Sequence, residues 1–85
     1  MSSYVYVLRC GDGSLYTGWT NDLKQRLAAH QSGKGAKYTR GRLPIDMVYY
    51  EELPDKSTAL KRENELKNLK KAEKELLIQQ AKQSL

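Results

Sequence analysis

The chain of 85 residues has few of the residues that build disulfide-linked, metal-bound or membrane-spanning proteins. One cysteine, Cys10, and one histidine allow neither an intramolecular disulfide nor a cysteine-histidine zinc site. No stretch approaches the roughly 20 apolar residues of a membrane span, and the N-terminal MSSYVYVLRC lacks the basic flank and apolar core of a secretory signal. These absences predict a reduced, cytoplasmic protein without a membrane partner.

Acidic residues are missing from the segment between Lys24 and Arg42, although ten are present elsewhere in the chain. The segment carries six of the 15 basic residues, so the other nine are offset by the ten acids. It also holds Tyr38 and three glycines. Such a segment is a plausible contact for a phosphate backbone. The alternative is a solvated loop without a partner.

What is present suits one small globular domain over residues 1–85. Hydrophobic residues make up 39% of the chain and charged residues 29%. A chain of this length builds one core and hides only about 60% of its unfolded surface. We therefore expect a single core and a modest free energy of unfolding.

The first half reads as a hairpin followed by a helix. Tyr4 to Arg9 and Leu15 to Thr20 have strand composition and flank a turn at residues 11–13. Asn21 and Asp22 can cap a helix over about residues 21–32, which Gly33 would end. Residues 33–43 are rich in glycine and charge and are expected to form a loop.

The second half reads as one strand followed by helical sequence. Ile45 to Glu52 is strand-like, and Asp55 or Ser57 can cap the helical stretch that follows. No glycine or proline interrupts residues 56–85, but one helix of about 40 Å would leave much of its apolar face uncovered. We expect two helices with a bend near Asn68. The order β-β-α-β-α-α then predicts an α+β fold with a mainly antiparallel sheet.

Glu63 is unusual on this second helical stretch because of where it lies on the helix. A rotation of about 100° per residue places its carboxylate inside the apolar stripe that includes Ala59, Leu60 and Leu66. A partly buried carboxylate is costly unless it is paired, protonated or bound to a metal. The alternative to a functional role is a salt bridge to an arginine of the sheet or first helix.

Arg26 and His30 form a second candidate pair on the first helix. They are four residues apart and share a face beside Leu23 and Leu27. Arginine can hold a phosphate through two parallel hydrogen bonds, and histidine can transfer a proton near neutral pH. A surface arginine and a packed histidine are the plain alternative.

Taken together in order, these residues resemble the GIY-YIG nuclease family, in particular its small stand-alone bacterial members. The first motif is Tyr4-Val5-Tyr6 and the second is Tyr16-Thr17-Gly18, with nine residues between Tyr6 and Tyr16. Arg26 follows Gly18 by eight positions, and His30 and the helical Glu63 come after it. The resemblance covers nearly the whole chain.

The resemblance implies a three-stranded antiparallel sheet flanked by helices and a site that hydrolyses DNA phosphodiesters with one divalent ion, Mg²⁺ or Mn²⁺. Glu63 would hold the metal and Arg26 would steady the scissile phosphate. Tyr16, with Tyr6 nearby, would activate the attacking water, and His30 would transfer a proton or position its neighbours. A tyrosine with a pKa of about 10 costs about 4 kcal/mol as a base at pH 7 unless its surroundings lower that pKa. Arg26 and the metal could lower it.

The chain departs from the family pattern at several positions. The first motif has Tyr4 and Val5 in place of glycine and isoleucine, and Thr17 replaces the isoleucine of the second. No asparagine after Asn68 matches the polar residue that some members carry late in the domain. These departures leave the choice of target open.

Three hypotheses of function follow. The leading one is a metal-dependent DNA endonuclease of DNA repair or recombination, with Tyr6, Tyr16, Arg26, His30 and Glu63 as its site. The second is an inactive nucleic-acid-binding module, with RNA also open as a ligand. Its contacts would be the following residues: Lys24, Lys34, Lys37, Tyr38, Arg40 and Arg42. The third is a protein-interaction domain whose basic segment meets an acidic partner.

Overall fold

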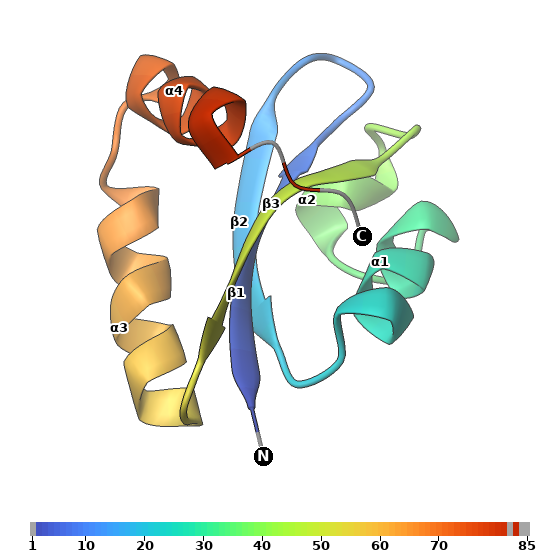
Figure 1. Cartoon of the computed structure of the whole chain (residues 1–85). Coiled ribbons are helices and arrows are strands. Elements are labelled where there is room, and N and C mark those ends of the chain that lie inside the picture. Colours follow the sequence, from blue (N-terminus) through green and yellow to red (C-terminus); the bar gives the residue numbers. More distant parts are fainter. Residues whose placement is uncertain (1, 82, 84–85) are drawn as a thin grey trace.

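The computed structural model describes residues 2–81 and 83 and has a three-stranded antiparallel sheet at its centre (Figure 1). The strands lie in the order β2-β1-β3, so β2 and β3 form the two edges. Their bounds are as follows: β1 Ser3–Arg9, β2 Leu15–Thr20 and β3 Asp46–Leu53. The predicted hairpin and third strand are confirmed.

The register of the hairpin determines which side chains share a face of the sheet. Tyr6 pairs with Gly18 and Leu8 pairs with Tyr16. Residues opposite one another or two apart along a strand point to the same side. Tyr6, Tyr16 and Gly18 therefore lie on one face, with Tyr6 and Tyr16 in diagonal positions across the two strands.

Within the described residues, four helices cover the sheet, two on each face (Figure 1). The bounds are as follows: α1 Leu23–Gln31, α2 Lys37–Arg40, α3 Lys56–Lys67 and α4 Lys71–Ala81. The carboxylate of Asp22 accepts from Gln25 N at the start of α1, and that of Asp55 accepts from Thr58 N at the start of α3. Both are N-caps, because the first helical N–H groups have no partner within their helix.

The two faces carry separate clusters of buried side chains. The cluster under α1 includes Tyr6, Leu8 and Ile45. The cluster under α3 consists of Val5, Ala59 and Leu66, with Leu77 of α4 packed against it. The alternation of Val5, Tyr6 and Leu8 along β1 supplies both clusters from one strand.

Two features differ from the sequence-based expectation. Residues 33–43 are not all loop, since they contain the single-turn helix α2. Leu60 is 41% exposed and lies outside the buried stripe of α3, which runs through Ala59 and Leu66. The division of the C-terminal stretch into two helices near Asn68 is confirmed. None of the helices over the described residues has the length and apolar character needed to traverse a bilayer.

Candidate active site

A continuous set of hydrogen bonds joins α1, β1 and α2 beneath the first face. Arg26 Nε donates to the Tyr6 hydroxyl at 3.3 Å, and that hydroxyl lies 2.9 Å from His30 Nε2. His30 Nδ1 lies 2.8 Å from the Thr39 hydroxyl, which donates to the Ala36 carbonyl at 3.1 Å. Tyr6, His30 and Thr39 are each 0% exposed. We call this set, from Arg26 to Thr39, the relay.

One assignment of donors and acceptors satisfies every hydrogen bond of the relay. The Thr39 hydroxyl gives its hydrogen to a carbonyl, so it accepts from His30 Nδ1–H. His30 Nε2 must then be unprotonated and accept from the Tyr6 hydroxyl. Burial, together with the nearby charge of Arg26, lowers the pKa of His30 to about 4. Geometry and pKa agree that His30 is neutral at pH 7.

Tyr6 is not activated by these surroundings. Burial raises its pKa above the usual value, and this outweighs the lowering by the hydrogen bond and charge of Arg26. Arg26 does lower the pKa of Tyr6, as expected of an arginine beside a tyrosine, but burial raises this pKa by more. Tyr6 keeps its proton, which is the state that its hydrogen bond to His30 requires.

Two glycines make room for the relay. A Cβ atom at Gly18 would lie 2.6 Å from the Tyr6 hydroxyl, and one at Gly35 would lie 2.4 Å from His30 Nδ1. Both distances are far below ordinary van der Waals contact, so a side chain at either position would displace the relay. The glycine of the second motif thus has a steric role next to Tyr6.

Arg26 is held in place but keeps free hydrogen-bonding capacity. Its Nε is bound to Tyr6 and its Nη2 donates to the Gly35 carbonyl at 3.1 Å. A guanidinium has five N–H groups, so three remain for a ligand. The side chain is half-buried and borders a hollow of about 400 Å³ whose walls also include Trp19 and Gln25. Arg26 can therefore bind an anion at the mouth of this hollow.

Tyr16 belongs to a stack of side chains beside the relay. Its ring centre lies 5.4 Å from that of His30 and 5.8 Å from that of Tyr38, to which it is nearly parallel. The Arg42 guanidinium lies 4.0 Å from the centre of the Tyr38 ring. The Tyr16 hydroxyl itself makes no hydrogen bond to the described residues 2–81 and 83. The stack fixes the ring and leaves the hydroxyl available.

Glu63 approaches the site from the other face of the sheet. It lies one turn from both Ala59 and Leu66, so it lies on the side of α3 that packs against the sheet. Its side chain is 17% exposed and lies 3.5 Å from Lys67 Nζ, a partner on its own helix rather than an arginine of the sheet. Burial is the main cause of the raised pKa of Tyr6, and the negative charge of Glu63 adds the smallest contribution.

Comparison with known proteins identifies the family of this chain. A family model described as the GIY-YIG catalytic domain matches residues 2–76. The chain belongs to the GIY-YIG family. This is a nuclease family, so membership implies a nuclease-like function on a nucleic-acid substrate.

The similar proteins are small bacterial and archaeal GIY-YIG proteins called UPF0213. One from Natronomonas pharaonis is 52% identical over 75 residues, which are 88% of each chain. One from Streptococcus sanguinis is 61% identical over 61 residues, 72% of this chain and 70% of the relative. The solution structure of the UPF0213 protein of Bacillus halodurans has a TM-score of 0.59 and 49% identity, covering 93% of this chain and 84% of its own.

GIY-YIG nucleases generally use divalent metal ions, and the donor set here fits a hard ion that keeps most of its water. Over the described residues no group of three or more His, Cys, Asp or Glu side chains gathers around one point. Glu63 offers one partly buried carboxylate, with a side chain that is 17% exposed. One carboxylate suits Mg²⁺, which is bound by few protein groups together with waters and substrate phosphate.

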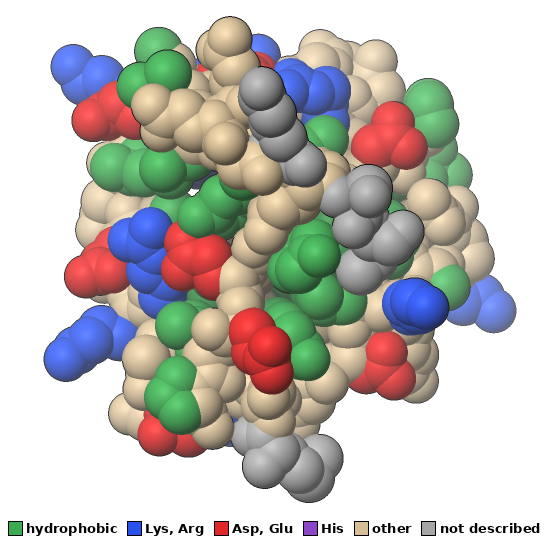
Figure 2. Space-filling view, viewed as in Figure 1, with side chains coloured by type: hydrophobic (Ala, Val, Ile, Leu, Met, Phe, Trp, Pro, Cys, Tyr) green, Lys and Arg blue, Asp and Glu red, His purple; other side chains and the backbone are tan. Residues whose placement is uncertain are grey.

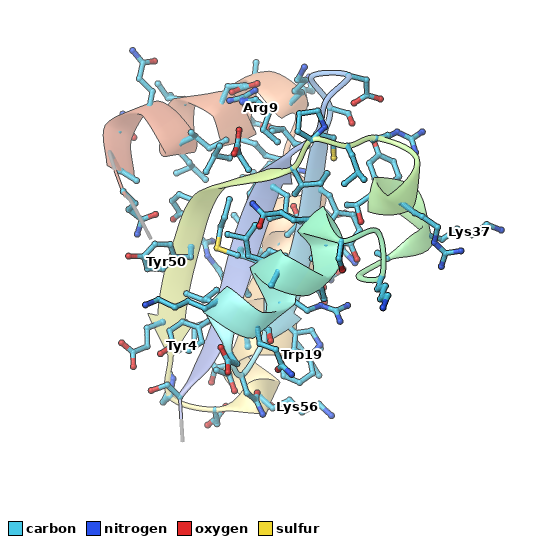
Figure 3. The ribbon with its side chains drawn as sticks, turned by 90° about the vertical axis from the view of Figure 1, so that its right-hand side faces the viewer. Tyr4, Arg9, Trp19, Lys37, Tyr50 and Lys56 are labelled. Atoms are coloured by element: carbon cyan, nitrogen blue, oxygen red, sulfur yellow. The ribbon has the colours of Figure 1, made fainter. Side chains whose placement is uncertain are left out.

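The basic segment divides into free and engaged side chains. Lys24, Lys34, Lys37 and Arg40 are exposed, and Figure 3 shows Lys37 extending from α2 into solvent. Arg42 is engaged, because its Nε lies 3.0 Å from Asp12 and its Nη1 donates to the Tyr38 carbonyl at 2.7 Å. By contrast, Figure 2 shows acidic and basic side chains intermixed over α3 and β3.

Sequence reasoning missed two parts of this site. Thr39 completes the relay from α2, and Gly35 both accepts from Arg26 and gives His30 its space. A lone threonine in a short helix and a glycine in a loop carry no local signal of such contacts. Their roles arise only when α2 folds back on α1.

Proposed function

We propose that the protein is a divalent-metal-dependent endonuclease that hydrolyses DNA phosphodiester bonds, acting in DNA repair or recombination. The observation that carries the proposal is the relay, which holds Arg26 against Tyr6 and Gly35 with three N–H groups unbound by the described residues. Groups held in advance where charge develops are the main source of catalysis in phosphodiester hydrolysis.

Each side chain has a role that its surroundings support. Arg26 binds the scissile phosphate through its free N–H groups. Tyr16, whose hydroxyl has no partner among the described residues, orients the attacking water and, in its deprotonated tyrosinate form, accepts the proton of that water. Glu63 would hold the Mg²⁺ or Mn²⁺ ion, which supplies Lewis-acid stabilisation of the phosphate and a more acidic bound water.

The relay positions Arg26 rather than transferring protons. A pKa of about 4 makes neutral His30 a weak acceptor of a proton at pH 7. The raised pKa of Tyr6 makes its loss of a proton unfavourable as well. Of the two roles considered for His30, the structure favours orientation of Tyr6 and through it of Arg26.

Cleavage of labelled duplex, flapped and branched DNA with Mg²⁺ or Mn²⁺ tests the proposal. Glu63→Gln should reduce the rate at least about 100-fold, the usual cost of removing one key group. Glu65→Gln is the matched control, since Glu65 lies on the same helix with a side chain 59% exposed. The proposal fails if the wild-type protein cuts none of these substrates or if the Glu63 variant cuts them equally well.

A second candidate is a module that binds nucleic acid without cutting it. The exposed cations Lys24, Lys34, Lys37 and Arg40, in a segment without acids, favour it. It predicts binding with metal removed by chelation, an affinity that falls steeply with salt, and no product at any metal concentration. Binding that does not depend on salt would count against it.

A further inference from the structure

A hollow of about 290 Å³ lies where β2 begins, and its lining includes Lys71 and Lys74, which have no role in the site described above. Three separate parts of the chain line it: the hairpin turn with the start of β2, α2, and the first turn of α4. Its walls are formed by the following residues: Asp12, Ser14, Leu15, Tyr38, Lys71 and Lys74. We call it the lysine hollow.

The lysine hollow is continuous with the candidate active site. Leu15 directly precedes Tyr16 on β2, and Tyr38 stacks on the Tyr16 ring at 5.8 Å. The hollow beside Arg26 and Trp19 lies toward the other end of the same strand. Because an extended strand advances about 3.3 Å per residue, Leu15 and Trp19 are separated by about 13 Å. The two hollows therefore lie on either side of the tyrosine along one sheet edge.

The charge in the lysine hollow is positive after internal pairs are taken into account. The Asp12 carboxylate accepts from Arg42 at 3.0 Å and from the Ser14 hydroxyl at 2.6 Å, so it is already compensated. Lys71 and Lys74 lie three residues apart on one side of α4. Within residues 2–81 and 83, neither lysine has a carboxylate oxygen within 4.0 Å of its nitrogen. The charge of Lys71 acts on Glu75 without forming an ion pair, and both ammonium groups line one cavity.

α4 is fixed against the sheet, so these lysines are presented in a defined place. Arg9, at the end of β1, forms two hydrogen bonds with Glu75 at 2.7 and 2.6 Å. Figure 3 shows Arg9 beside α4 at this end of the sheet. Leu77 packs against the cluster of Val5, Ala59 and Leu66. A paired lysine site on a rigid element suits recognition of a phosphate group as a point charge.

We propose that the lysine hollow binds a backbone phosphate of the same DNA strand that is cut, close to the scissile phosphate held by Arg26. This inference rests on the proposed function, because it takes the strand to lie along β2 past Tyr16. It gives α4 a role in substrate binding and gives the protein an anion site on each side of the reacting bond.

The test pairs single phosphates with the two lysines. In a Glu63→Gln background with metal removed, affinity is measured by fluorescence anisotropy for labelled DNA in which each phosphate in turn is a neutral methylphosphonate. A methylphosphonate at one particular position should weaken binding by about twofold to fivefold, which is the effect expected from the loss of an exposed charge pair. When Lys71→Gln and Lys74→Gln are added to this background, a methylphosphonate at the same position should no longer change the affinity. The double variant should also lower the salt slope by about 1 per lysine.

Lys61→Gln is the control, since Lys61 is an exposed lysine on α3 outside the hollow. It should leave both the phosphate profile and the position of maximum effect unchanged. Equal thermal melting of the variants confirms that they are folded. The proposal is overturned if the effect of each methylphosphonate on affinity is the same with and without the two lysines. It is also overturned if the lysines bind inorganic phosphate but their removal changes the effect of no single position on the DNA.

The outcomes for the two proposals remain separate because binding is measured without cleavage. Coupling between one phosphate and the lysines, with no cleavage by the wild-type protein, would support the hollow and reject the nuclease. Cleavage without such coupling would support the nuclease and reject the hollow. Absence of any DNA binding would reject the hollow.

Discussion

The buried side chains under α1 and α2 include a polar set bonded end to end, whereas those under α3 and α4 form an apolar cluster. Tyr6, His30 and Thr39 on the first face satisfy one another through directional bonds. Val5 and Leu66 on the second face contribute through buried area. A polar network whose hydrogen bonds are all satisfied fixes the geometry of its side chains, and breaking it is costly. An apolar cluster supplies stability but tolerates rearrangement of its side chains.

This division explains how a chain of 85 residues can hold a site in place. The apolar face supplies stability with help from ion pairs, such as Arg62 with Glu51 at 2.9 Å. The polar face holds Arg26 and Tyr16 in position. Glu63 is the exception among the proposed site residues, since it lies on α3 on the apolar face. The comparison predicts different consequences for damage on the two faces.

Truncation on the apolar face should have the largest effect on stability. Leu66→Ala removes a side chain that is 0% exposed and should lower the free energy of unfolding by about 2–5 kcal/mol. Chemical denaturation measures this change. Leu76→Ala, at a position 53% exposed on α4, should cost little. A small loss at Leu66 would show that α3 contributes less to the core than its burial indicates.

As the pH falls, the protein should first lose stability through His30 on the polar face. His30 has a pKa of about 4 in the folded protein and 6.5 when unperturbed, so the unfolded chain binds the proton more readily between these values. Folding loses free energy as the pH falls through this window, by about 3 kcal/mol in all. Carboxylates of lowered pKa, such as Glu51, add their loss at lower pH.

Denaturant unfolding of the wild type and of His30→Gln across this pH range isolates the effect. Glutamine does not titrate, so the variant should lose much less stability between pH 6.5 and 4. The carboxylates are the same in both proteins and cancel in the difference. Parallel stability curves would contradict a neutral, buried His30.

A break at the far end of the relay should cost less. Thr39→Val keeps the shape but leaves His30 Nδ1–H without its acceptor, which should cost about 1–3 kcal/mol. Thr39→Ser retains the hydroxyl and should restore most of the loss. As the chain has one histidine, the ring nitrogen signals in an NMR spectrum report its tautomer directly. A wild-type spectrum with hydrogen on Nε2 would refute the direction assigned to the relay.

The sequence predicted those features that depend on local pattern. The hairpin, the break near Asn68 and the position of Glu63 inside a buried stripe follow from strand alternation, helix length and helical rotation. It did not predict α2 or the role of Thr39, because a single helical turn is set by contacts with His30 distant in sequence. The exposure of Leu60 was likewise missed, since its apolar character does not show which side of α3 faces the sheet.

Tyr16→Phe should have the smallest effect on stability and the clearest effect on function. Phenylalanine keeps the ring that packs beside His30 and Tyr38, so the free energy of unfolding should change by less than about 0.5 kcal/mol. Cleavage should fall by about 100-fold or more, because the oxygen that accepts the proton of the water as a tyrosinate is gone. Tyr38→Phe is the matched control in the same stack and should retain cleavage. A Tyr16 variant that cuts at the wild-type rate would show that the stack serves only to support His30, and proton acceptance would then have to be assigned elsewhere on the polar face.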